Sequence, residues 1–163
     1  MNDYLAKVHA LSQELNSARD LRTVIDVVTD HLPRILSATY CSLFIMNLSS
    51  NELELKAHNH EYIGDDPFIH VDSQQQGIMN LTIEHGQSMI VRDIQDEIGL
   101  TNKDKYKSKS FMCILIKHEG GVRGVINLAD KLDGQFEQND LLIASIVAEL
   151  LGPLLSHQDF CQI

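Results

Sequence analysis

The sequence predicts an α+β domain built on an antiparallel sheet of about six strands. The terminal helices are expected on one face of this sheet and an irregular segment on the other. Two pairs of strand-like runs are each joined by a turn, which favours hairpins over strand–helix–strand units. One run of each pair is apolar on both faces, as is typical of a central strand that is covered on both sides. Helical patterns lie before, between and after the two hairpins.

The composition fits one intracellular domain. A chain of 163 residues has the size of a single domain, and its formal charge of −10 provides no basic face for nucleic acid. The three cysteines show no CxxC spacing, which favours a reducing compartment over a disulfide framework or structural zinc. There is no signal-peptide pattern and no apolar run of about 20 residues, so we expect a cytoplasmic protein without a membrane span.

Two helices are expected at the N-terminus. Residues 3–16 show a narrow apolar stripe at helical spacing, made of Leu5, Val8, Leu11 (or Ser12) and Leu15. Asp20 then fits the N-cap of a second helix, in which Pro33 should kink the helix or mark an end near its last turn.

The first hairpin joins residues 40–48 to residues 52–58. Both faces of the first run are apolar, with Cys41, Leu43 and Ile45 on one and Phe44, Met46 and Leu48 on the other. The second run alternates strictly. Its apolar residues should therefore share one inward face, namely Leu53, Leu55 and Ala57.

The sequence predicts that the middle of the chain is an irregular segment that covers one face of the sheet. Residues 59–75 are polar, with a short extended piece near residues 68–71. Residues 76–85 fit a helix that Gly86 ends, residues 89–91 a brief strand, and Asp93 the cap of a short helix that Gly99 ends. The lysine-rich run 103–109 fits either a solvated loop or an anion-attracting lid.

The second hairpin consists of residues 110–117 and 122–129, around a turn at 119–121. Gly124 lies inside the second strand, which suggests a close approach of another backbone or side chain. Asn139 or Asp140 should cap a last helix, which Gly152-Pro153 should bend or end.

Three segments in this order resemble the GAF domain family. They are Val122–Lys131 followed by Phe136 and Asp140, Gly77-Ile78 with residues 85–94, and the strand that begins at Cys41. The resemblance covers about residues 20 to 155. It implies pairing through the terminal helices and a small molecule bound between the sheet and the irregular segment. We accordingly divide the chain into an N-terminal helix at 1–19, a GAF domain at 20–157 and a tail at 158–163.

The sequence argues against one ligand class of this family. The cyclic-nucleotide members carry an Asn-Lys, a spacer, a Phe and an Asp-Glu. Here Asp130 replaces the Asn and Leu141 replaces the Glu, while Lys131, Phe136 and Asp140 remain. We expect these three to be structural, together with Gly124. Lys131 should form a surface ion pair with Asp140, and Phe136 should anchor the loop.

Other chemistries find little support. There is no Cys-His dipeptide for bilin attachment, and Cys41 and Cys113 are expected to be inert core thiols. His58, His60 and His70 together with Asp72 could hold a metal. We interpret these side chains as exposed polar groups instead. Free methionine sulfoxide reductase is a GAF domain of similar length, but this chain has no cysteine between 42 and 112.

The main hypothesis is therefore a sensory input domain of a bacterial signalling protein, such as a two-component system, that controls an attached output domain. The ligand remains unknown, and no catalytic residue or metal site is expected. A ligand-free dimerisation module, with its cavity filled by side chains such as Phe44, Met46 and Met112, is the alternative. In either case the helix at 3–16 should pair with a second copy. Cavity-facing candidates are Phe44, Phe68, Asp93, Ile94, Met112 and Ile114.

Overall fold

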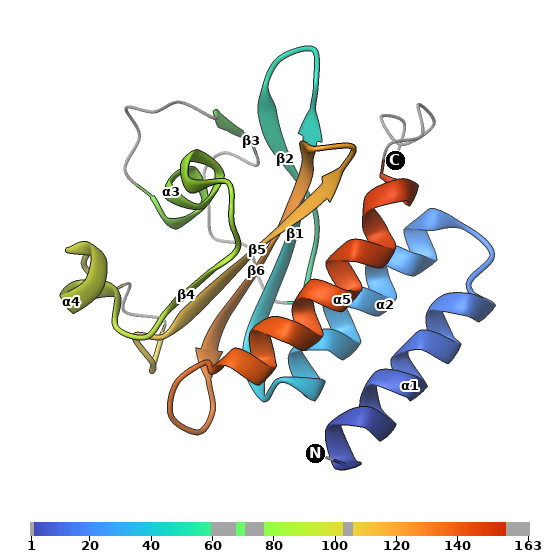
Figure 1. Ribbon diagram of the computed structural model, residues 1–163, viewed down its shortest axis with the longest axis horizontal. Coiled ribbons are helices and arrows are strands. Elements are labelled where there is room, and N and C mark those ends of the chain that lie inside the picture. The colour runs from blue at the N-terminus through green and yellow to red at the C-terminus, as the bar shows by residue number, and fades with distance from the viewer. Residues whose placement is uncertain (1, 60–67, 71–76, 103–105, 156–163) are drawn as a thin grey trace.

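Six antiparallel strands form one sheet in the order β3-β2-β1-β6-β5-β4. A computed structural model describes residues 2–59, 68–70, 77–102 and 106–155 (Figure 1). Its strands are β1 (Ala38–Asn47), β2 (Glu52–His58), β3 (Phe68–His70), β4 (Met89–Val91), β5 (Phe111–His118) and β6 (Gly121–Lys131). Its helices are α1 (Asn2–Ser17), α2 (Leu21–Ile35), α3 (Ile78–His85), α4 (Ile94–Ile98) and α5 (Gln138–Leu154). The predicted fold class and element order are confirmed.

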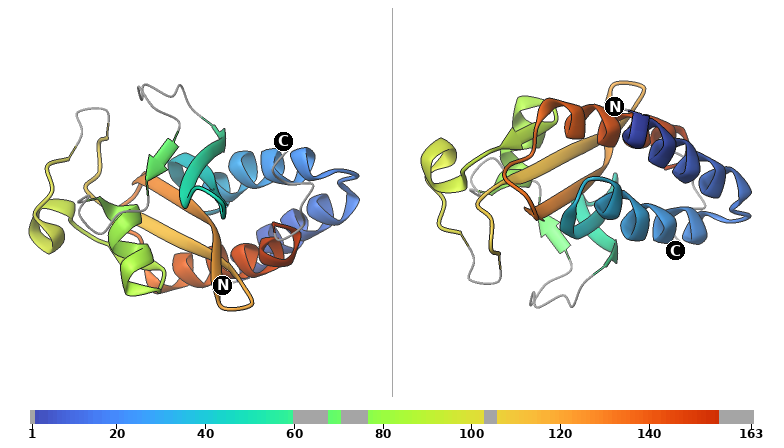
Figure 2. Two further views of the ribbon diagram at one scale, coloured as in Figure 1. Left: turned by 90° about the horizontal axis from the view of Figure 1, so that it is seen from above. Right: turned by 90° about the horizontal axis from the view of Figure 1, so that it is seen from below.

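The two faces of the sheet carry different layers. The first face packs against α2 and α5, with α1 packed on α2, and the second face lies toward α3 and α4 (Figures 1 and 2). The central strands β1, β6 and β5 contribute apolar side chains to both faces, as their two-sided apolar patterns predict. None of the described helices is long and apolar enough to cross a membrane.

The facing of the first hairpin is partly different from the prediction. In β1 the two faces alternate as expected, but Leu48 lies in the following turn and is exposed. In β2, Leu53 and Leu55 pack on the second face whereas Ala57 packs on the first. The pairing register shifts between Leu43 and Phe44, and such a β-bulge reverses the facing of the residues beyond it.

Helix ends follow local capping chemistry. The Asp20 side chain accepts a hydrogen bond from the Thr23 amide at 2.8 Å and begins α2, which continues through Pro33 to Ile35. The expected cap of α5 is wrong by two or three residues. Glu137 is the N-cap, and Asp140 is the third helical residue of a reciprocal capping box.

Helix α1 has a place in the core, which the sequence analysis did not foresee, while its pairing with a second copy stays a prediction. Leu11 is 3% exposed, and Val8 and Leu15 pack against the same cluster as α2 and α5. The exposed aliphatic stripe lies instead on α5. Its members recur every four residues and are 43–54% exposed: Leu142, Ile146, Leu150 and Leu154.

Candidate functional site

The second face of the sheet and the helices that cover it make the candidate site. Two apolar clusters lie on this face. One is centred on Phe44, Leu115 and Val125, and the other on Phe111 and Ile94. Ile78 of α3 packs against both clusters, so this helix spans the space between them.

Helix α3 is fixed to strand β5 by polar contacts at its end. Gly86 takes the left-handed conformation that ends the helix, with φ of 70°. Its carbonyl accepts a hydrogen bond from the Lys117 ammonium. The Leu115 amide donates to Ser88 Oγ at 2.9 Å. The helix therefore holds a defined position over the sheet.

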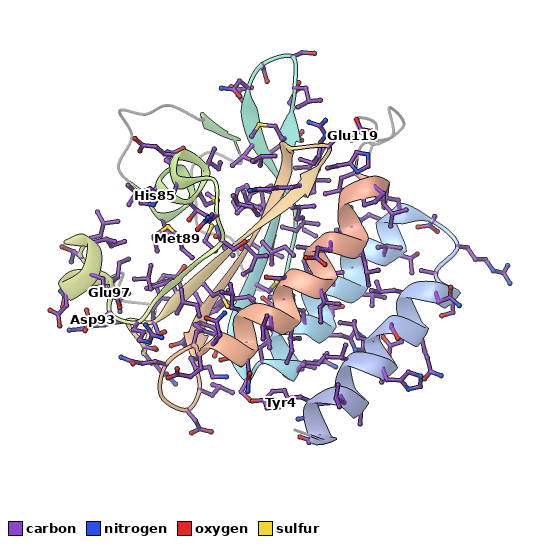
Figure 3. All side chains as sticks on the ribbon, in the orientation of Figure 1. Tyr4, His85, Met89, Asp93, Glu97 and Glu119 are labelled. Carbon is purple, nitrogen blue, oxygen red and sulfur yellow. The ribbon has the colours of Figure 1, made fainter. Side chains whose placement is uncertain are left out.

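Two carboxylates accept hydrogen bonds from the backbone amides at the start of helix α4. One belongs to Asp93, which precedes the helix, and the other to Glu97, which lies within it. Asp93 Oδ1 accepts from the amides of Gln95 and Asp96, at 2.9 and 3.1 Å. Glu97 Oε1 accepts from the amides of Arg92 and Asp93. Figure 3 shows Asp93 and Glu97 close together at this end of the helix. Both acids therefore serve the backbone, and the turn that they fix presents Ile94 to the apolar cluster.

Asp130 joins β6 to the segment before β5. Its Oδ1 accepts hydrogen bonds from the backbone amides of Lys107 and Ser108, at 2.9 and 2.8 Å. The residue is 4% exposed and has a φ of 63°, a left-handed conformation that side chains other than glycine adopt at a cost. The carboxylate thus holds part of the lysine-rich run in place. Residues 103–105 of that run lie outside the described residues.

Lys131, the next residue, contacts the terminal helices on the other side of the sheet. Its ammonium lies 3.4 Å from Asp140 Oδ1 and donates to the Leu36 carbonyl at the end of α2. The predicted pair forms, but it is not on the surface, because the two side chains are only 8% and 5% exposed. Phe136 is fully buried beside it, and the Lys131 ammonium lies 5.6 Å from the centre of its ring. The strand, α2 and α5 therefore meet at one buried cation.

Glycine at 124 is required by close packing. A Cβ there would lie 2.6 Å from the carbonyl oxygen of Phe44 in the neighbouring strand. The close approach suggested by the sequence is present.

The cavity-facing candidates divide between the two faces. Phe44 and Ile94 contribute to the clusters of the second face, and Asp93 caps α4 as described. Met112 and Ile114 pack toward the terminal helices, so their predicted facing is wrong. Their neighbours Phe111 and Cys113 face α3 and α4 instead. Phe68 belongs to β3, and its side chain lies outside the described residues, as do the side chains of His60, His70 and Asp72.

Sequence reasoning missed two polar residues near the centre of the second face. Ser42 of β1 pairs with Asn127 of β6, and both are partly exposed. They interrupt strands in which nearly all other central positions are buried and apolar. The sequence signal for this site was a polar residue inside an apolar strand. Ser42 lies two residues from Phe44, and Asn127 lies two residues from Val125, so both polar residues belong to the second face.

The two described cysteines are unsuited to redox catalysis. Both are fully buried and unpaired. Burial raises the pKa of the Cys113 thiol to about 12, and a hydrogen bond with Thr82 offsets this only in part. Burial also raises the pKa of Cys41, with a smaller contribution from Asp30. A thiol that stays protonated is a poor nucleophile. Cys161 lies outside the described residues.

A concave surface lies between the terminal helices. A groove of about 520 Å³ runs between α1 and α5, with Val24 of α2 in its lining. Leu150 and Leu154 of the exposed stripe belong to its wall. No group of three or more potential metal ligands occurs among the described residues.

Comparison with known proteins identifies close structural relatives. The GAF domain family model matches residues 20–154. No curated protein matches the sequence significantly. Among solved structures, the GAF domain of a phosphoenolpyruvate-protein phosphotransferase from Coxiella burnetii aligns with a TM-score of 0.80 at 20% identity, over 95% of this chain and 94% of that one. The corresponding domain from Acinetobacter gives 0.79 at 15% identity, over 96% and 95%. Free methionine-R-sulfoxide reductase from Neisseria meningitidis gives 0.78 at 15% identity, over 98% and 90%. At these identities the structural likeness establishes the fold alone.

Proposed function

The chain belongs to the GAF domain family, and we propose that it is a cytoplasmic sensory or regulatory domain of a bacterial signal-transduction protein. A small molecule binds between the second face of the sheet and the covering helices α3 and α4. Binding alters the terminal helices, which control an attached output domain or a partner protein. The observation that carries this proposal is the partly exposed pair Ser42 and Asn127, which lies between two buried apolar clusters.

The covering layer supports this assignment. Helices α3 and α4 are held by specific polar contacts, so the face they cover has a defined shape. A preformed apolar surface with a few placed polar groups is the usual character of a small-molecule site. A ligand that interacts differently with two arrangements of this layer shifts the balance between them.

Native mass spectrometry and an absorbance spectrum of the purified protein test the proposal directly. We expect either a retained ligand mass or a rise in melting temperature with members of a metabolite panel. A ligand at 100 times its Kd stabilises the native state by about 2.7 kcal/mol. A protein without retained mass that also fails to respond to the panel contradicts the sensor proposal.

The exposed stripe of α5 favours a second role, pairing of two copies through the terminal helices. The stripe and the neighbouring groove form one apolar surface, and a twofold axis would bring it against its own copy. Leu150→Glu should convert a dimer to a monomer in sedimentation at micromolar concentration. Leu132→Glu is the matched control, since Leu132 is 66% exposed but lies before α5 and outside the stripe. A monomeric native protein contradicts this proposal.

A reductase activity is the weaker alternative. The resemblance in fold to free methionine-R-sulfoxide reductase favours it, but both described thiols are buried and have raised pKa values. We expect no reduction of free methionine sulfoxide in a thioredoxin-coupled assay that follows NADPH oxidation. Turnover that survives replacement of Cys41 and Cys113 and is lost on replacement of Cys161 would assign the activity to the third cysteine.

A further inference from the structure

The register of the central strands arranges the second face into three rows. Each row takes one residue from β1, one from β6 and one from β5. The outer rows are Phe44, Val125 and Leu115 on one side and Tyr40, Ala129 and Phe111 on the other. The middle row is Ser42, Asn127 and Cys113. A polar row therefore separates two apolar ones.

Asn127 is the polar group of this row that requires explanation. From Gly124 to Asp130, every residue of β6 except Asn127 is buried. Within the described part of the chain, no hydrogen bond joins the Asn127 side chain to another residue. An amide held dry and unpaired would destabilise the fold, so the partial exposure leaves it available to water or to a ligand. Its CONH₂ group offers both a donor and an acceptor.

Four charged side chains from the elements around this face already have partners. Asp130 accepts two backbone amides, and the Lys117 ammonium donates to Gly86. Asp93 and Glu97 cap α4. The nine residues of β1, β6 and β5 that form the three rows include no aspartate, glutamate, lysine, arginine or histidine. A charged ligand group placed on the middle row would lose hydration without gaining a described counter-charge.

An aromatic group lies along one side of the polar row. Tyr106 meets Tyr40 and Phe111 edge to face, with ring centres 5.5 and 5.1 Å apart. The Tyr106 phenol is uncharged at neutral pH, and burial raises its pKa further. An apolar or aromatic ligand body next to the row would pack against this group.

We propose that Asn127 determines ligand specificity in this site. Its amide pairs with a carboxamide- or lactam-type donor and acceptor on an uncharged small molecule. Ser42 borders the same position, and the outer rows hold the apolar remainder of the ligand. This inference rests on the proposed sensory function and names the ligand chemistry of that site.

Matched fragment pairs test the inference. Nicotinamide and benzamide each differ from nicotinate and benzoate mainly by an amide in place of a carboxylate. In ¹H–¹⁵N spectra, the two amides should shift the side-chain NH₂ signal of Asn127 at millimolar concentration, and the two carboxylates should not. Asn127→Leu should weaken amide binding about tenfold or more, because two hydrogen bonds are lost. Asn139→Leu, an exposed position at the start of α5, is the matched control and should bind normally.

Stability separates a recognition role from a structural one. Asn127→Leu should melt at the same temperature as the native protein or higher, because it removes an unpaired amide from an apolar surface. A clear fall in melting temperature would make Asn127 structural and overturn the inference. Asn127→Asp provides a second, isosteric variant and should also lose amide binding.

The failure of the inference can be told apart from failure of the sensor proposal. Carboxylates that bind as well as the amides, or amides that bind Asn127→Leu unchanged, overturn the inference but leave a ligand-binding domain. Absence of binding by all four fragments also overturns it. A ligand mass retained by the native protein would in that case still support sensing.

Discussion

Replacing Lys131 by Met removes a buried cation that joins β6, α2 and α5. At 3.4 Å and an effective dielectric of about 20, its attraction to Asp140 is about 5 kcal/mol. The change leaves a carboxylate that is 5% exposed without its cation, although that carboxylate still accepts the Glu137 amide at 2.9 Å. Breaking a buried pair in this way costs about 3–5 kcal/mol. The remaining hydrogen bond places our expectation near the lower end, about 3 kcal/mol.

Urea unfolding followed by circular dichroism measures this change. In a domain of this size, a loss of about 3 kcal/mol corresponds to a fall of roughly 6–12 °C in melting temperature. Lys131→Met combined with Asp140→Leu should cost less than the sum of the two single changes, because neither charge is then left unpaired. A loss below about 1 kcal/mol in Lys131→Met, or strictly additive losses, would show that the pair behaves as an exposed one and would refute the reasoning.

Three further changes test other parts of the structure. Gly124→Ala should cost about 1–3 kcal/mol in urea unfolding, since its Cβ meets the Phe44 carbonyl, and a neutral result would contradict that close approach. In a variant without the third cysteine, Cys41 and Cys113 should react with a disulfide reagent at pH 8 only after unfolding, because burial raises both thiol pKa values; rapid native reaction would contradict this. Asp20→Ala should lower the melting temperature at neutral pH. Hydrogen bonds from Thr23 lower the pKa of Asp20, so its contribution is present above the ordinary value of 3.8 and fades as pH falls through the lowered pKa; a constant difference down to pH 2 would refute this assignment.

The sequence predicted elements well where one residue type has one structural use. Asp93 and Gly99 bound α4 as expected, because a side-chain acceptor is needed at the start and a left-handed residue at the end. The helix that Gly86 ends was found for the same reason. Capping of α5 was harder, because Glu137, Asn139 and Asp140 are all plausible near its start and only the three-dimensional contacts select among them.

Facing in β5 could not be predicted because the strand is apolar on both sides. Every residue from Phe111 to Ile116 is buried. No polar position therefore shows which alternate set of side chains faces the terminal helices. Met112 and Ile114 were therefore assigned to the wrong face. In β6 such a mark exists at Asn127, and the pairing of that residue with Cys113 fixes the parity of β5 as well.

Burial of the Lys131–Asp140 pair depends on contacts that no local pattern contains. The ammonium is enclosed by the end of α2, which is 95 residues away in the chain, and by the ring of Phe136. From the sequence alone, an ion pair between a lysine and an aspartate is expected at the solvent-exposed surface. Only the assembled layers exclude water here.

Asp130 and Lys131 are neighbours in the chain, but their side chains contact opposite layers of the domain. The Asp130 carboxylate holds the segment at residues 107–108, and the Lys131 ammonium holds α2 and α5. The left-handed φ of Asp130 sets the direction in which the next residue leaves the strand. If segment 107–108 moved away, that φ would lose the two hydrogen bonds that support it, and its relaxation toward negative values would rotate the peptide that carries Lys131. In the proposed sensory domain, this backbone torsion would connect the segment at residues 107–108 with α2 and α5 without a rearrangement of the core between them.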